Sequence, residues 1–100
     1  MASDFNQTQR LPSQDDASAQ FNFGVMYYQS EGVRQNYAKA VKWYQKSAKQ
    51  GYALAQQNLG VMYSKGKGVR QNRATAKEWF GNSCDNGNQN GCDAYRQLNE

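Results

Sequence analysis

Few residues in this chain could do covalent chemistry. Ser64 and Lys67 have the S-x-x-K spacing of the nucleophile motif of penicillin-binding enzymes. That chemistry needs the serine at a helix start and the lysine one turn later on the same face. Here the tetrapeptide runs into Gly66 and Gly68, which favour a helix end, and no S-D-N or K-T-G partner motif is present. The sequence therefore disfavours catalysis, and we expect a protein that is not an enzyme.

Metal and cofactor chemistry also has little to build on. The 100 residues contain no histidine and two cysteines, Cys84 and Cys92. The commonest general base and the commonest ligand of transition metals are thus absent. Two cysteines without histidine do not complete a four-ligand zinc site. We expect neither a metal nor a cofactor.

A 36-residue internal repeat organises the chain. The motifs G-V-M-Y and G-V-R-Q-N begin at Gly24 and Gly32 and return at Gly60 and Gly68. Residues 17–52 align with residues 53–88 without a gap, and 18 of the 36 positions are identical. The identities fall on small and aromatic residues rather than on charges. Such a repeat indicates stacked supersecondary units that share one core.

Capping residues and periodicity predict two helices in each copy. Asp16, Asn36 and Asn72 are suited to helix starts, and Gly51 is suited to a left-handed helix end. Gly24 and Gly60 lie inside helices at a cost of about 1 kcal/mol against alanine. We therefore expect a neighbouring helix to approach closely at both positions. The predicted helices span residues 16–29, 37–50, 53–64, 73–86 and 90–98.

The sequence predicts a buried face and a basic face for the second helix of the first copy. Ala40, Trp43, Tyr44 and Ser47 share the buried face.

The middle of the chain is strongly basic. From Gly32 to Lys77 it has ten lysines and arginines and no acidic residue. This charge favours acidic partners. Two other interpretations are a solvated face and an anionic-polymer site formed by Lys39, Lys42, Lys46 and Arg73. Nucleic acid is disfavoured, because exposed aromatic residues that stack bases are lacking beside the lysines. The expected basic face consists of Lys39, Lys42, Lys46 and Lys49.

The pattern A-x-A-x-x-x-F/L-G-x-x-Y, then G-V-x-x-N, then A-x-A-x-x-W-Y/F and a closing glycine resembles the Sel-1-like repeat, a relative of the tetratricopeptide repeat. The resemblance covers residues 17–98 and implies an all-α fold, a right-handed α-solenoid (α/α superhelix). It implies repeats at 17–52 and 53–88 and a capping half-repeat at 89–100, within a domain at 15–100. Residues 1–14 are mostly polar and include Pro12, so we expect them to form a mobile tail. Ser30 departs from the pattern, since the second copy has Gly66 there.

The resemblance also bears on the two cysteines. Their spacing is similar to that of cysteine-rich, exported members of the family, which implies a disulfide between Cys84 and Cys92 and a periplasmic or secreted mature form without its signal peptide. The alternative is two reduced cysteines in a cytoplasmic protein. No stretch of the sequence approaches the roughly 18 apolar residues of a membrane span.

The concave face of the expected solenoid is the candidate binding site. If the tetratricopeptide geometry carries over, the first helix of each copy lines this face, and aromatic anchors with polar neighbours suit a protein partner. Phe21 has the alternative of packing against the N-terminal tail. Two repeats are fewer than the roughly three usually needed for stability, so the disulfide, the aromatic frame, the N-terminal tail or self-association must supply the rest. We expect a monomer or weak self-association. A scaffold, a host-directed factor and a toxin-immunity protein all fit. The candidate residues are Phe21, Val25, Tyr28, Gln29, Gln57, Val61, Ser64 and Lys65.

Overall fold

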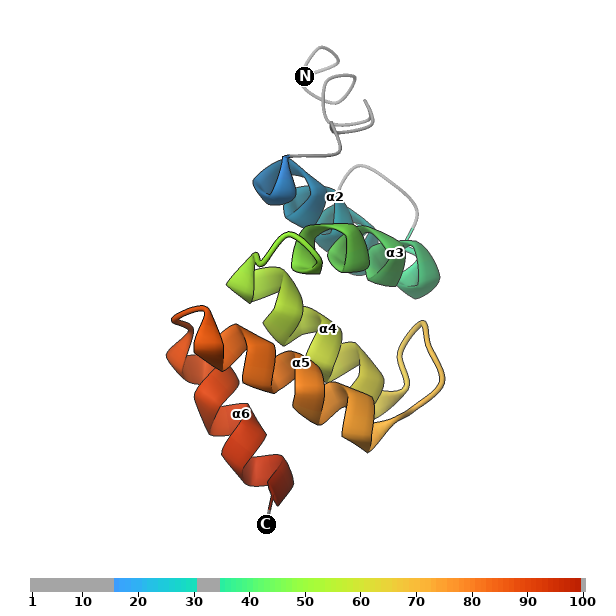
Figure 1. Ribbon diagram of the computed structural model, residues 1–100. Helices are drawn as coiled ribbons and strands as arrows, with labels where there is room; N and C mark the ends of the chain where they lie inside the picture. Colours follow the sequence, from blue (N-terminus) through green and yellow to red (C-terminus); the bar gives the residue numbers. More distant parts are fainter. Residues whose placement is uncertain (1–15, 31–34, 100) are drawn as a thin grey trace.

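The computed structural model describes residues 16–30 and 35–99, and these residues form helices and no strand. Consecutive helices pack against one another in a staggered array that runs from one end of the molecule to the other (Figure 1). The expected all-α solenoid is confirmed, and each helix bound lies within two residues of its predicted position. The predicted tail and Gly32 lie outside the described residues. The helices are α2 (Ala17–Gln29), α3 (Tyr37–Ala48), α4 (Ala53–Lys65), α5 (Arg73–Asp85) and α6 (Gln89–Asn99).

Three helices begin at the predicted capping residues. The side chains of Asp16, Asn36 and Asn72 each accept a hydrogen bond, at 3.0 Å, from the backbone N–H three residues further on. These bonds satisfy donors that the first helical turn leaves unpaired. Helix α4 differs, because Tyr52 precedes it without a side-chain cap bond.

Identical hydrogen bonds lock the two helices of each repeat together. Ser47 Oγ donates to the carbonyl of Ala17 at 2.7 Å, and Ser83 Oγ donates to the carbonyl of Ala53 at 2.8 Å. Both serines are fully buried. A buried hydroxyl requires a partner, so the recurrence of serine at this position has a structural reason.

An aromatic ring packs against each of the glycines inside α2 and α4. A Cβ atom at Gly24 would lie 2.7 Å from the ring of Tyr44, and one at Gly60 would lie 2.6 Å from the ring of Phe80. The expected close approach is therefore confirmed, and the approaching group is a ring on the second helix of the same repeat. Each ring fills the space where another residue would have its Cβ.

The turn after α2 keeps its conformation although Ser30 replaces the usual glycine. Ser30 has φ +65° and ψ +25°, and Gly66 has φ +71° and ψ +37°. The N–H of each residue bonds to a helix carbonyl four residues earlier, that of Met26 or Met62. The two copies thus share a left-handed helix end, and Ser30 adopts it despite carrying a side chain.

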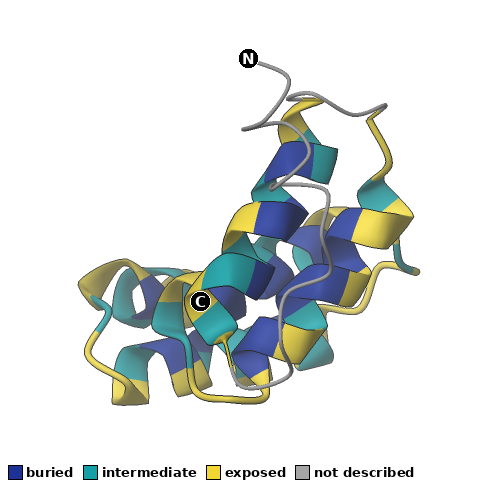
Figure 2. Cartoon of the chain, turned by 90° about the horizontal axis from the view of Figure 1, so that it is seen from above, coloured by how far each residue is buried: buried dark blue, intermediate teal, exposed yellow. Residues whose placement is uncertain are grey.

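The core lies along the inner surfaces of the helices, where the buried residues gather (Figure 2). Tyr44, Leu59 and Met62 are its largest fully buried apolar side chains. The predicted buried face of α3 is confirmed. The opposite face is exposed, also as predicted, and carries Lys39, Lys42, Lys46 and Lys49.

Candidate functional site

A cavity of about 170 Å³ lies where the first repeat meets the second. Its walls come from α2 and α4, and Tyr44 of α3 contributes between them. We call it the α2–α4 groove. Both repeats are needed to form it. An apolar cavity of similar size, about 150 Å³, accommodates a benzene ring, so this groove has room for one large apolar side chain. Its lining residues are Val25, Tyr28, Gln29, Tyr44, Asn58, Val61 and Met62.

Tyr44 brings a phenol into the groove from an otherwise buried position. The residue is 1% exposed, and its ring packs against that of Phe21 with centroids 5.8 Å apart. Burial raises the pKa of Tyr44, a hydrogen bond with the Asn58 side chain lowers it, and the nearby Tyr28 raises it. The net pKa lies above the usual tyrosine range. The hydroxyl therefore stays protonated, and with Asn58 it supplies polar contacts to an apolar groove.

This burial predicts a dependence of stability on alkaline pH. The folded protein holds the Tyr44 proton to a higher pH than the unfolded chain does, so the stabilisation is complete below the pKa of free tyrosine, near 10, and is lost as the pH rises above it. We expect the free energy of unfolding to fall more steeply above about pH 10 in the wild type than in Tyr44→Phe. Urea unfolding of both proteins at several alkaline pH values measures this, and parallel curves would contradict it.

A lysine lies at the rim of the groove beside Tyr28. The Nζ atom of Lys67 is 5.7 Å from the ring centroid of Tyr28 and 5.5 Å from that of Tyr37, and it donates to the Tyr28 hydroxyl at 3.5 Å. The two rings are themselves in contact, with centroids 5.3 Å apart. Cation–π attraction of this kind holds an ammonium group in place without neutralising it. The rim is therefore positively charged.

Four of the candidate residues predicted from the sequence line the groove: Val25, Tyr28, Gln29 and Val61. Phe21 lies apart from this lining. It is half-buried, and its ring packs against those of Tyr44 and Tyr52.

The other three candidates have different neighbours. Gln57 accepts a hydrogen bond from the side chain of Asn88 at 2.7 Å. Ser64 donates to the carbonyl of Val61 in its own helix at 3.0 Å. Lys65 is exposed in the last turn of α4.

Sequence reasoning missed three lining residues: Tyr44, Asn58 and Met62. Tyr44 was assigned to the buried face of its helix, and it does lie there while also reaching the groove. Asn58 and Met62 have identical counterparts in the first copy, Asn22 and Met26. Identity between the copies does not distinguish a lining residue from one that only packs in the core, so the repeat gives no signal for these two residues.

The S-x-x-K tetrapeptide does not form the geometry of a serine nucleophile. Ser64 is in the last turn of α4, and the helix ends at Gly66 in a left-handed conformation. Lys67 therefore follows the helix end and does not lie one turn further along the same helix. Its ammonium instead contacts the rings of Tyr28 and Tyr37.

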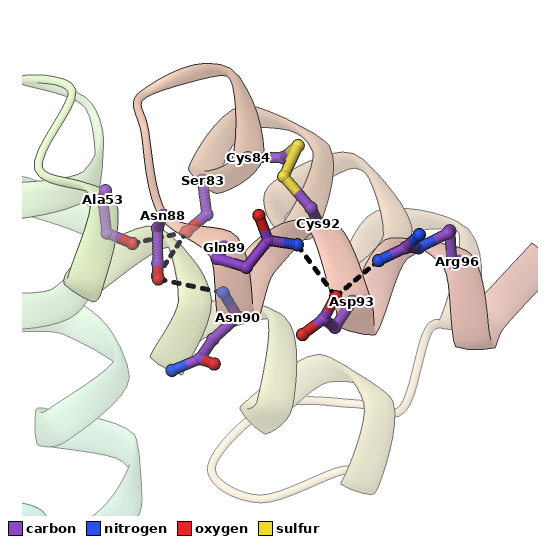
Figure 3. Close-up of a disulfide and its surroundings, with 9 residues drawn as sticks. All are labelled: Ala53, Ser83, Cys84, Asn88, Gln89, Asn90, Cys92, Asp93 and Arg96. Carbon is purple, nitrogen blue, oxygen red and sulfur yellow. Dashed lines mark hydrogen bonds and ion pairs between the residues drawn. A yellow bond between two sulfur atoms is a disulfide. The ribbon is translucent and has the colours of Figure 1, made fainter.

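A disulfide between Cys84 and Cys92 joins the end of α5 to α6, with Cα atoms 4.5 Å apart (Figure 3). The predicted bond is confirmed. Next to it, Asp93 accepts hydrogen bonds from Gln89 at 3.0 Å and from Arg96 at 2.6 Å. The Gln89 bond and then the Arg96 bond lower the pKa of Asp93 below its usual range. Covalent and polar contacts together fasten this end of the array.

Comparison with known proteins gives one family match and several structural neighbours. The family model of the Sel1 repeat matches residues 17–52 and 53–88. No match is found among curated protein sequences. Within the part of the chain that the structure describes, no helix is long and apolar enough to cross a bilayer.

Three solved structures are similar to this chain. A protective antigen present in uropathogenic Escherichia coli strains, with an SLR fold, is 44% identical with a TM-score of 0.74, over 75% of this chain and 16% of that one. A Sel1 repeat protein from Oxalobacter formigenes is 32% identical with a TM-score of 0.81, over 83% and 62% of the two chains. Cysteine-rich protein B of Helicobacter pylori shows the same fold at 24% identity and a TM-score of 0.76, over 78% and 59%. This chain therefore spans less than two thirds of each neighbour.

Proposed function

The chain belongs to the Sel1 repeat family, whose repeats mediate protein–protein interactions, and we propose that it binds another protein through the α2–α4 groove without chemistry of its own. The observation that carries this proposal is the cavity at the junction of the repeats. It combines apolar side chains, a buried phenol and two side-chain amides. Sites of this composition suit an anchoring side chain from a protein partner.

The size of the cavity favours a protein partner over a small molecule. Its volume of about 170 Å³ is below the roughly 300–1,000 Å³ of typical small-molecule pockets. One side chain of a larger partner fits, and the rest of the partner would lie around the mouth of the groove. Two lining residues of α2 also differ between the copies, since Tyr28 corresponds to Ser64 and Gln29 to Lys65.

The disulfide supports a location outside the cytoplasm. Disulfides persist in oxidising compartments and are rare in the cytosol, and the bond between Cys84 and Cys92 closes the end of the array. We place the protein in the periplasm or outside the cell. A scaffold, a host-directed factor and a toxin-immunity protein are the roles that fit such a binding module.

The basic face of α3 gives less support to an anionic-polymer binder. Lys39 lies over the ring of Tyr27 at 5.4 Å, and Lys46 lies over the ring of Trp43 at 5.0 Å. These rings already contact the lysines of the chain itself, whereas binding of single-stranded nucleic acid uses free rings that stack on bases. The lysines are better explained as a solvated face that also attracts acidic partners.

A charge placed in the groove should abolish most of the partner binding. Val61→Asp puts a carboxylate among the apolar lining residues, where desolvation opposes binding. We expect affinity for the partner to fall by at least about tenfold. The measurement is affinity capture from an extract of the source organism with quantitative mass spectrometry. Calorimetric titration with the captured protein then gives the Kd.

The matched control is Leu54→Asp. Leu54 is on the same helix, is 46% exposed and does not line the groove. Circular dichroism must show that both variants are folded. A partner retained by the wild type and by Leu54→Asp, and lost by Val61→Asp, supports the proposal. Equal retention of the same proteins by all three refutes the groove as the binding site.

A further inference from the structure

The charge at the rim of the groove has aromatic neighbours and, among residues 16–30 and 35–99, no carboxylate partner. The ammonium of Lys67 lies near the rings of Tyr28 and Tyr37, and the residue is half-buried. Within residues 16–30 and 35–99, the ion pair present is the one between Arg96 and Asp93, at the far end of the array. Lys67 is thus a positioned cation, with donors left over after its bond to the Tyr28 hydroxyl.

The surroundings of this cation extend the positive charge. Lys65 is exposed in the last turn of α4, and it occupies the same position in its repeat as the groove residue Gln29 does in the first. Residues 32–77 include ten basic residues and no acidic one. The positive potential around the groove does not attract an uncharged ligand. It attracts an acidic ligand over a distance and holds it at the rim.

We infer that the occupant of the groove is an extended segment of the partner protein that inserts one apolar side chain between Val25 and Val61 and sets an aspartate or glutamate against Lys67. The volume allows a single large side chain. The amides of Gln29 and Asn58 provide hydrogen bonds for the main chain of the segment. Because the positive charge extends over a broad region, a side-chain carboxylate fits it better than the single carboxylate at a chain terminus does. This inference rests on the proposed function.

The next junction along the array lacks the same chemistry. In the repeat alignment, the positions of Tyr28, Asn58 and Val61 are taken there by Ser64, Ala94 and Gln97. The second junction thus has a serine in place of the aromatic ring, an alanine in place of the amide and a glutamine in place of one valine. We therefore expect one segment to bind to each chain.

Selection from a library of short random peptides displayed on phage tests the inference directly. The bait is the whole oxidised chain, and a parallel selection uses Val61→Asp. We expect the wild type to enrich peptides that share a leucine, methionine or phenylalanine with an aspartate or glutamate a few residues away. The same peptides should be missing from the Val61→Asp selection.

A double-mutant cycle then tests the contact with Lys67. A selected peptide, amidated at its C-terminus, is compared with its Glu→Gln (or Asp→Asn) form on the wild type and on Lys67→Gln. We expect the loss of the carboxylate to weaken binding to the wild type by about fivefold and to leave binding to Lys67→Gln unchanged. Lys42→Gln is the matched control, because it removes the same charge from the outer face of α3.

Each outcome separates the inference from the proposed function. If the selected peptides require the apolar residue and Val61 but do not prefer an acidic residue, the acidic segment is refuted. The proposed binding in the groove then still stands. A carboxylate effect equal on Lys67→Gln and the wild type also refutes the contact. Peptides enriched equally by Val61→Asp refute an extended segment as the occupant, and the capture experiment then decides whether a folded partner uses the groove.

Discussion

Removal of the Cys84–Cys92 disulfide is expected to lower the free energy of unfolding by about 2.5 kcal/mol, the value that the chain-entropy model gives for so short a closed loop. The bond joins residues eight apart, at the end of α5 and in α6. The measurement is urea unfolding, followed by circular dichroism, of the oxidised protein and of Cys84→Ser/Cys92→Ser. We expect a lower midpoint for the variant with little change in the slope.

The two repeat junctions explain why this bond matters. At the first junction, Gln56 Nε2 donates to the carbonyl of Ala48 at 3.0 Å. A shift of 36 residues turns this pair into Cys92 and Cys84. A disulfide therefore holds the second junction at the position where a buried hydrogen bond holds the first.

The second junction is also less apolar than the first. Val41 and Leu59, which are buried at the first junction, correspond to Lys77 and to Tyr95, which is 37% exposed. In α6 the buried residue is Gly91. With less apolar surface removed from water, the second junction gains less from the hydrophobic effect, and α6 depends more on its covalent link.

A second variant separates the covalent link from the local contacts. Cys84→Ala/Cys92→Gln gives the second junction the residue pair of the first. It should recover part of the loss, about 1 kcal/mol, if the hydrogen bond forms as it does between Gln56 and Ala48. Equal midpoints for the oxidised protein and the double serine variant would show that packing alone holds α6.

The helices could be predicted from the sequence because several local signals agreed. Asn36 and Asn72 mark helix starts, Gly51 and Gly87 have the positive φ values of helix ends, and each signal recurs 36 residues on. A repeat supplies two independent observations of one local structure. Ser30 shows the limit of this reasoning, because its backbone follows the repeat and not its own preference.

The groove could be predicted only in part, because its depth depends on how the helices pack. Val25 and Val61 were recognised as facing residues from their place in the repeat. Tyr44 lies on a different helix, and its contribution depends on the space between α2 and α4. Gln57 was expected to face a partner, yet it bonds to Asn88 in the turn before α6, a contact between distant parts of the chain that the helical pattern does not contain.

Gly60→Ala is expected to destabilise the protein by about 2 kcal/mol, although alanine is the better helix former. The added Cβ atom would lie 2.6 to 2.9 Å from three atoms of the Phe80 ring. Phe80 is 4% exposed, so its ring has little room to move, and overpacking of a tight core costs about 1–3 kcal/mol. Urea unfolding of the variant and the wild type measures the difference.

Gly81→Ala is the matched control, because Gly81 is also inside a helix and also faces a ring. Its added Cβ atom would lie 3.3 Å from the ring of Tyr95. Tyr95 is 37% exposed and can shift toward solvent, so the gain in helix propensity of up to about 1 kcal/mol should dominate. We expect opposite signs for the two variants. If both variants are more stable than the wild type, the Phe80 ring moves aside without loss of stability. Close packing is then not the reason for glycine at the centre of α4.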